Sequence, residues 1–528
     1  MVKLLKRRLE KKDRKKDKKF GIKGDTDHLK PFRLSEIVED NITRLKNSMN
    51  NTFDIKSREF QIGGTKYQAA ILYIADLVNE EMIMSHLLKP LILQSTEVID
   101  SDTEVNFQSV KDSMLSIGSV QEAETFDEIV LAVMSGDTFL CIQGYAKGLI
   151  VNTRELNGKP FAVPTVEPSV KGPQEAFVET LKINLGLIRK RIRDPNLMLE
   201  EYKIGRRSKS ESVLVYIKGI ADPDIVEDLR KRLSSVDLDM GQSAFQIGTL
   251  VTDRPDSIFP QVQITERPDK LVVSLSEGRV AVLTDGSPNA ILVPVTLPIL
   301  MQSPDDYCES WLVSSLIRIS RYVGLFLSSL FPAIYIAITS YNPGMLPTRL
   351  VLSIASTRTG VPFSAFIEAL LMEAVLELLQ EASIRLPKAV GQTVSIVGGL
   401  VIGQSAVQAG IVSPIMVIVI SVTAVTSFAI PDYSLGLASR ILRVPFMILA
   451  TTLGSFGIAI GMLLLLTYLS SLKNFGIRYL SPITPYRFQD WKDTVIRAPF
   501  KDLKKRPEFL NPEDTERSHS RKKEKEIS

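Results

Sequence analysis

Three long stretches without a charged side chain constrain the fold more than any other feature of this sequence. They run from Tyr322 to Thr348, from Ala389 to Pro431 and from Val444 to Leu472. About 20 apolar helical residues cross a hydrocarbon core of about 30 Å. The second stretch would form a helix of about 64 Å, so it should cross twice, with a break between Gly410 and Pro414. We therefore predict four membrane crossings, at about 322–340, 389–409, 411–430 and 445–470.

Charges at the ends of these stretches indicate the orientation. Arg318 and Arg321 precede the first crossing, and Lys473 and Arg478 follow the last one. Positive residues gather on the cytoplasmic side, so both ends of the bundle should face the cytoplasm. The predicted fold class is a multi-domain integral membrane protein with two α/β cytoplasmic subdomains followed by an α-helical transmembrane bundle. The boundaries are a basic disordered tail 1–33, subdomain 1 at 34–160, a linker 161–174, subdomain 2 at 175–300, the membrane bundle 301–472 and a charged C-terminal tail 473–528.

Short apolar runs and helical spacing predict the elements of the soluble part. In the first subdomain, Gln68–Ala75 and Thr138–Gln143 should be strands, and Asp76–Leu93 should be helical. In the second, a helix should start near Phe177, and another should cover Pro223–Leu233 with Asp222 as its cap. Strands are expected at Ser212–Ile217, Val262–Thr265, Leu271–Leu275, Val280–Leu283 and Ile291–Thr296.

A five-residue pattern occurs twice in this subdomain, thirteen residues apart. Thr-Asp-Arg-Pro-Asp at 252–256 is followed by Thr-Glu-Arg-Pro-Asp at 265–269. Pro and Asp favour turns, so each copy should form a turn with an arginine free to meet a carboxylate. The alternative is a salt-bridge cluster facing a ligand or another subunit. The candidate residues are Arg254, Asp256, Arg267 and Asp269.

The basic N-terminal tail carries eleven Lys or Arg and three acids between Met1 and Lys19 (11 − 3 = +8). No apolar segment stands there, so a cleaved signal peptide is not expected. A solvated tail and attraction to an anionic cytoplasmic leaflet both fit this composition. Nucleic acid is not an expected partner because no aromatic residues are interleaved with the charges.

An acidic helix, 362–386, lies between the first and second predicted crossings. Glu373, Glu377 and Glu381 fall on one face of it, whereas Glu368 lies off that stripe. Carboxylates facing lipid are costly, so they must meet water, a pore, or cations such as Arg349, Arg358 and Arg385. From these residues alone, two possibilities stand equally: an amphipathic helix at the membrane interface, and a ring of acids from several subunits lining a cation path.

Small residues four positions apart indicate close helix packing in the predicted bundle. Metal or cofactor chemistry has no comparable support: two cysteines and three scattered histidines form no ligand pattern, and no phosphate-binding glycine motif is present. We therefore expect no catalytic, metal or cofactor site and no enzyme activity. The candidate packing glycines are Gly399, Gly403, Gly410, Gly457 and Gly461.

Several motifs in one order resemble the A subunits of GerA-type spore germinant receptors. They include Thr357–Phe363, the acidic helix, Arg385–Pro387, Ser395–Gln404 and Ala409–Pro414. In the soluble half, Phe259–Val262, Thr265–Asp269 and Glu277–Arg279 add to the resemblance, which covers about residues 35–490; Gly399 stands where the family often has Ala.

The resemblance implies a non-enzymatic subunit of the spore inner membrane. It would assemble with a transporter-like B subunit and a C-subunit lipoprotein, and respond to small nutrients. It would also oligomerise with copies of itself, contact membrane lipid, and form a nutrient-gated channel for monovalent cations that triggers spore germination. With the resemblance, Glu373, Glu377 and Glu381 are expected to face the pore. A secondary transporter of ions or small solutes is the alternative, with a site near the break at Gly410.

Overall fold

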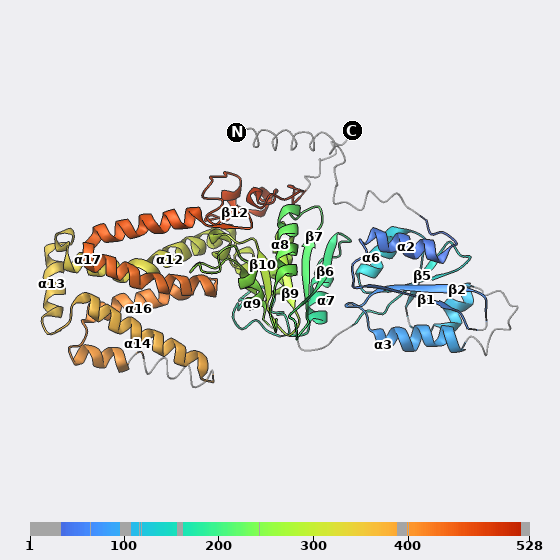
Figure 1. Ribbon diagram of the computed structural model, residues 1–528, viewed down its shortest axis with the longest axis horizontal. Coiled ribbons are helices and arrows are strands. Elements are labelled where there is room, and N and C mark those ends of the chain that lie inside the picture. Colours follow the sequence, from blue (N-terminus) through green and yellow to red (C-terminus); the bar gives the residue numbers. More distant parts are fainter. Residues whose placement is uncertain are drawn as a thin grey trace.

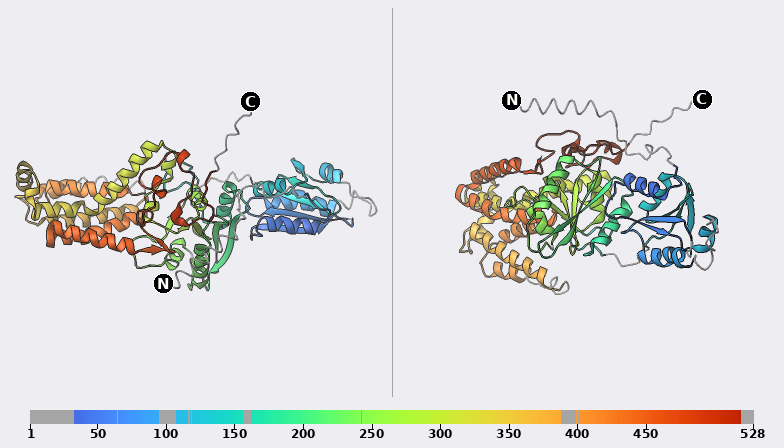
Figure 2. Two further views of the ribbon diagram at one scale, coloured as in Figure 1. Left: turned by 90° about the horizontal axis from the view of Figure 1, so that it is seen from above. Right: turned by 45° about the vertical axis from the view of Figure 1, so that its right-hand side comes forward.

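The computed structural model describes residues 33–518, apart from 64, 95–106, 116, 118, 156–161, 242, 388–398 and 400. The two sheet-containing subdomains and a helical bundle follow one another along the long axis of the molecule, with subdomain 2 in the middle (Figures 1 and 2). The predicted basic tail lies outside the described residues, except for its last residue. Most of the predicted crossing 389–409 also lies outside them.

Subdomain 1 is a five-stranded antiparallel sheet with helical segments on both faces (Figure 1). The predicted strands at 68–75 and 138–143 are confirmed as β2 and β4. All five residues of β4 are buried because both faces of the sheet are covered, which explains the continuous apolar run. The strand order is β1-β2-β4-β5-β3, with β1 Ile55–Gln61, β2 Gln68–Ile74, β3 Val120–Ala123, β4 Thr138–Ile142 and β5 Gly148–Val151.

The helical segments of subdomain 1 form two separate apolar clusters with the sheet. On one face lie α2 Val38–Ser48 and α6 Phe126–Met134. On the other lie α3 Glu80–Met82, η2 Ile83–Leu88, η3 Pro90–Gln94, α5 Phe107–Ser109 and η4 Val110–Met114.

Subdomain 2 repeats this three-layer plan with the strand order β6-β7-β9-β10-β8. Helices α7 Leu181–Arg191 and α10 Pro268–Ser276 cover one face, and α8 Pro223–Ser235 and α9 Ala244–Leu250 cover the other. The strands are β6 Leu197–Ile204, β7 Ser210–Ile217, β8 Gln263–Thr265, β9 Val280–Thr284 and β10 Ala290–Val293.

One predicted strand of this subdomain is wrong. Residues Leu271–Leu275 belong to helix α10, whose first position is Pro268 and whose buried side chains include Leu271 and Leu275. The apolar run is too short to distinguish the four-residue spacing of a helix from the alternation of a strand. Pro268 favours the helix, because proline is common at the first helical position. The prediction for α8 is confirmed, because the Asp222 side chain accepts a hydrogen bond from the amide of Asp224 at the start of that helix.

The helical part contains α12 Trp311–Ser340, η6 Pro343–Met345, α13 Thr348–Arg358, α14 Ala365–Arg385, α16 Pro414–Phe428 and α17 Tyr433–Ser471. In the described part of the chain, α12 and α17 are the helices long and apolar enough to cross a membrane. The predicted break is present: Gly410 has a positive φ of 68°, and Ser413 and Pro414 then begin α16.

Helix α17 is folded in two rather than straight, unlike the single crossing predicted at 445–470. Gly454 has φ 64° and ψ −143°, and the helix reverses there, so its arms lie side by side (Figure 1). A Cβ on Gly461 would lie 2.7 Å from the Phe446 ring. Hydropathy measures the length of an apolar run but not its direction, and the sequence therefore suggested one helix where the structure has a hairpin.

Residues 473–518, predicted only as a charged tail, are folded against subdomain 2 and the start of α12. We call this segment the collar; it contains β11 Lys473–Asn474, β12 Ile477–Arg478, η7 Asp490–Lys492, η8 Phe500–Asp502 and η9 Glu508–Leu510. The side chain of Asn474 accepts a hydrogen bond from the amide of Val295 (2.8 Å) and donates one to the carbonyl of Gln261 (2.6 Å). Subdomain 2 is thereby bonded directly to the segment that follows the bundle.

Buried charges join the collar to the first turns of α12. Arg318 donates to the carboxylates of Asp306 and Asp493, each at 2.8 Å, and Arg321 also pairs with Asp306. The carboxylate of Asp306 and the guanidinium of Arg318 are almost fully buried. Asp306 lies in η5 Pro304–Tyr307, which follows α11 Leu297–Leu300, so this network fixes the connection between subdomain 2 and the bundle.

Candidate functional site

Helix α14 lies at one edge of the bundle, against α12, α16 and α17 (Figure 1). It is built mainly from Ala, Leu, Met and Glu, which favour helix, and it begins after Ser364. Its exposed side changes along the helix: apolar side chains come first, and Glu377 and Glu381, with the exposed Leu378 between them, follow toward the C-terminal end. The exposed apolar residues of the first half are Ile367, Leu370, Leu371 and Ala374.

Glu373, the first acid of the predicted stripe, is mostly buried. It accepts a hydrogen bond from Arg443 of α17 at 2.8 Å, and the side chains are 12% and 1% exposed respectively. The same guanidinium donates to the carbonyl of Ser328 on α12 at 2.6 Å and to that of Thr423 on α16 at 3.4 Å. A single arginine therefore joins α12, α14, α16 and α17.

Glu377 and Glu381 remain exposed, with 59% and 56% of their side-chain surface accessible. Glu377 lies 3.6 Å from Arg440, whose guanidinium also donates to Gln380 at 2.5 Å. Glu381 pairs at 2.6 Å with Arg385 of its own helix. The stripe thus divides into one acid that holds the bundle together and two that face outward.

Glu368 lies off the stripe, as the sequence indicates, and its side chain is fully buried. One oxygen is 3.2 Å from Arg358 of α13, and the other accepts a hydrogen bond from the amide of Ser413 at 2.8 Å. The acid therefore connects α13 and α14 to the N-terminus of α16, where an anion is stabilised by the free amides. This contact lies immediately after the break at Gly410.

The sequence identifies Arg358 and Arg385 as partners of these acids but not Arg440 and Arg443, which matter more for the bundle. Their spacing of three residues, immediately before an uncharged stretch, places both on one helical face, and this signal could have been used. Arg349 is exposed and forms no ion pair with another described residue.

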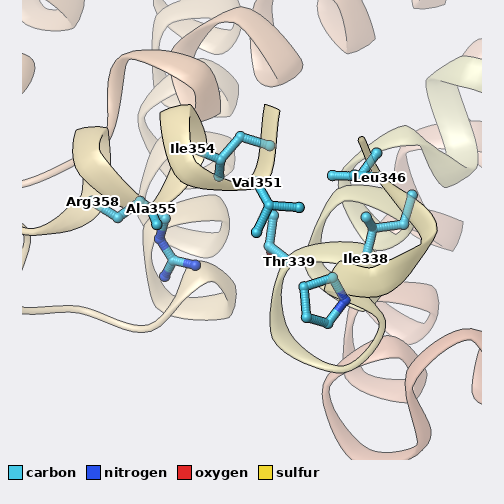
Figure 3. Close-up of a pocket in the computed structure, with 8 residues that line it drawn as sticks. Ile338, Thr339, Leu346, Val351, Ile354, Ala355 and Arg358 are labelled. Atoms are coloured by element: carbon cyan, nitrogen blue, oxygen red, sulfur yellow. The ribbon is translucent and has the colours of Figure 1, made fainter. Parts of the chain in front are cut away.

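A cavity of about 180 Å³ lies at the end of the bundle far from the two α/β subdomains. It is formed between the end of α12, η6 and α13, and Arg358 is on its wall together with apolar side chains and Thr339 (Figure 3). The same arginine reaches the buried Glu368, so this cavity and the charged contacts share a residue.

The packing glycines have unequal surroundings. A Cβ on Gly399 would meet none of the described residues within 4 Å, and one on Gly403 would lie 3.8 Å from Val417. A Cβ on Gly457 would lie 2.1 Å from the Leu449 carbonyl, and Gly461 is similarly close to the opposite arm of α17. Close approach therefore requires glycine mainly in the hairpin.

The two copies of the repeat also differ. Arg267 is 1% exposed, donates to Asp269 (2.8 and 3.1 Å) and bonds the carbonyls of Glu167 and Pro173. It holds the connecting segment against α10. Arg254 and Asp256 are exposed. Within the described residues, only the second copy therefore pairs its arginine with a carboxylate, whereas in the first copy Asp253 pairs with Arg232 of α8 at 2.6 Å.

Comparisons with known proteins agree along nearly the whole chain. Residues 43–509 match the family described as GerA, Bacillus/Clostridium GerA spore germination protein. The chain is 40% identical to spore germination protein B1 of Bacillus subtilis (strain 168), covering 92% of this chain and 99% of that one. It is 38% identical to spore germination protein GerLA of Bacillus cereus, covering 89% and 95%. Among solved structures, the N-terminal domain of the A subunit of the Bacillus megaterium spore germinant receptor GerK3 matches at 31% identity and a TM-score of 0.40, covering 50% of this chain and 97% of that one.

Proposed function

Because this chain belongs to the Bacillus/Clostridium GerA spore germination family, we propose that it is the A subunit of a nutrient germinant receptor and forms a nutrient-gated cation channel. In this proposal the bundle crosses the spore inner membrane several times. The soluble subdomains and the collar then lie on the cytoplasmic side.

The lengths and the charges of the bundle support this placement. Helix α14 would be about 31 Å long, which matches the hydrocarbon core. Arg318 and Arg321, near the start of α12, lie at the end that adjoins subdomain 2, and Lys473 and Arg478 follow the last helix there. This distribution is the one expected when that end faces the cytoplasm.

The exposed side of α14 is the observation that supports a channel. Copies of the chain arranged around an axis with α14 innermost would form an apolar constriction from Leu370, Leu371 and Ala374. Below it, toward the cytoplasm, Glu377 and Glu381 would form rings of acids that favour cations. Glu373 would instead hold each α14 in its own bundle through Arg443.

Nutrient would act through the partner subunits in this proposal. A transporter-like B subunit and a C-type lipoprotein would complete the receptor, and a nutrient that prefers one state of the complex would shift a closed-to-open equilibrium. Monovalent cations released through the pore would then trigger germination.

Potassium flux from liposomes containing the purified chain tests the channel without knowledge of the nutrient. Leu371→Asn should hydrate the constriction and raise potassium leak at least about tenfold, equivalent to about 1.4 kcal/mol of the barrier. In that background, Glu377→Gln with Glu381→Gln should lower the preference for potassium over chloride. Glu227→Gln, at an exposed position of α8 in subdomain 2, is the matched control and should change neither the potassium leak nor the preference for potassium over chloride.

Two results would count against the channel. An unchanged leak in a folded Leu371→Asn protein would mean that α14 does not line a pore. Uptake that saturates with solute concentration, in place of leak, would favour the secondary transporter.

A further inference from the structure

The joint between the two subdomains contains a buried ion pair. Arg189 of α7, in subdomain 2, donates to both oxygens of Asp54 in subdomain 1, at 2.8 and 3.1 Å, and to the hydroxyl of Thr52 at 3.0 Å. The two charged side chains are 1% and 0% exposed. The second terminal nitrogen of Arg189 donates to the Sδ atom of Met134 at 4.0 Å, so all three guanidinium nitrogens are engaged by groups of the other subdomain.

A second carboxylic acid lies beside this pair. Asp76 follows β2, and its carbonyl oxygen is 2.5 Å from where a Cβ would stand on Gly186 of α7. Its own Cβ is 4.0 Å from the same point. Gly186 and Arg189 are three residues apart, on one face of α7. Asp76 thus reaches the joint only because position 186 has no side chain.

One carboxyl oxygen of Asp76 has no hydrogen-bond partner among the described residues. This atom, Oδ2, is buried. The charges that act on it come from Asp54 and Lys56 in subdomain 1 and from Lys182 and Arg189 on α7. Lys182 already pairs with Glu80 at 3.2 Å, with both side chains half exposed. Burial first, and the negative charge of Asp54 second, raise the pKa of Asp76 to about 7.

We propose that Asp76 is a proton-operated switch that sets how firmly the two subdomains dock. When protonated, it is a neutral group that the buried joint tolerates. When ionised, it is a second anion beside a single arginine that is already bound to Asp54, and docking weakens. This inference goes beyond the proposed channel and does not rest on it.

The direction of the pH effect follows from proton linkage. The docked state holds the proton more tightly than the undocked state, in which the pKa of an exposed aspartate is near 4. The equilibrium constant for docking should therefore be largest below about pH 4. It should fall by up to about tenfold per pH unit as the pH rises, and become constant above about pH 7.

Distances between spin labels in the detergent-solubilised full-length chain would test the switch. Labels placed by Glu128→Cys on α6 and Asp224→Cys on α8, in a Cys308→Ser background, report on the two subdomains. We expect one narrow distance distribution at pH 5.5 and a broader one at pH 8. Asp76→Asn should keep the narrow distribution at both values. Glu39→Gln, at an exposed acid of α2, is the matched control and should behave like the parent protein.

Arg189→Met serves as a reference for the open joint and should give a broad distribution at both pH values. A narrow distribution in the parent protein at pH 8 would overturn the switch, provided that Arg189→Met is broad. Equal broadening of the parent protein and Asp76→Asn at pH 8 would also overturn it, because another group would then be responsible.

Discussion

Replacing Arg443 by glutamine should destabilise the helical bundle more than any change to the exposed acids. The substitution removes the contact with Glu373 and the hydrogen bond to the Ser328 carbonyl, while Glu373 stays mostly buried. Leaving one partner of a buried ion pair uncompensated costs about 3–5 kcal/mol. At roughly 2–4 °C per kcal/mol for a unit of this size, the midpoint of thermal unfolding should fall by about 6–20 °C.

The assay is the loss of the monodisperse chromatographic peak on heating the fluorescently tagged, detergent-solubilised chain. Arg385→Gln is the matched control because it removes the pairing of Glu381, where the side chains are 78% and 56% exposed. Exposed ion pairs contribute about 0–1 kcal/mol. The unfolding midpoint of Arg385→Gln should therefore differ from that of the parent protein by less than about 4 °C. Adding Glu373→Gln to Arg443→Gln should recover part of the loss, since no buried charge is then left alone. Equal midpoints for Arg443→Gln and Arg385→Gln would refute the assignment of Arg443 as the central contact of the bundle.

Two other substitutions test the hairpin and the collar. Gly454→Ala places a side chain at φ 64° and ψ −143°, a backbone region that favours glycine, and should cost about 1–3 kcal/mol, measurable as a lower midpoint in the same heating assay; an unchanged midpoint would contradict a sharp reversal there. Asn474→Ala removes a buried side chain that bonds two main-chain groups and should cost about 2–4 kcal/mol, seen as faster trypsin cleavage at Lys473 and Arg478, whereas Gln489→Ala, at an exposed position of the collar, should leave cleavage unchanged.

Features coded locally in the sequence are the ones it predicts well. The cap at Asp222, the buried strand around Phe139 and the break at Gly410 each depend on a few neighbouring residues, and the structure has all three. The reversal at Gly454 lacks such a marker, because glycine is common in apolar helices and only its positive φ reveals the turn.

The candidate site shows the same division. Helical periodicity places Glu373, Glu377 and Glu381 on one face, but it cannot show which acid is buried. That depends on Arg443, which is distant in sequence and reaches Glu373 only because the first arm of α17 packs nearby. The difference between a structural acid and an exposed one therefore depends on tertiary contacts.

The collar limits the motions available to the bundle. Its contacts with Arg318 fix the point where α12 enters the bundle, and Asn474 fixes the point just beyond the last helix, both against subdomain 2. The first and last helices therefore share one rigid base and have few independent degrees of freedom at that end. Any large rearrangement must arise between them, in α13 to α16, with the base acting as a stationary frame.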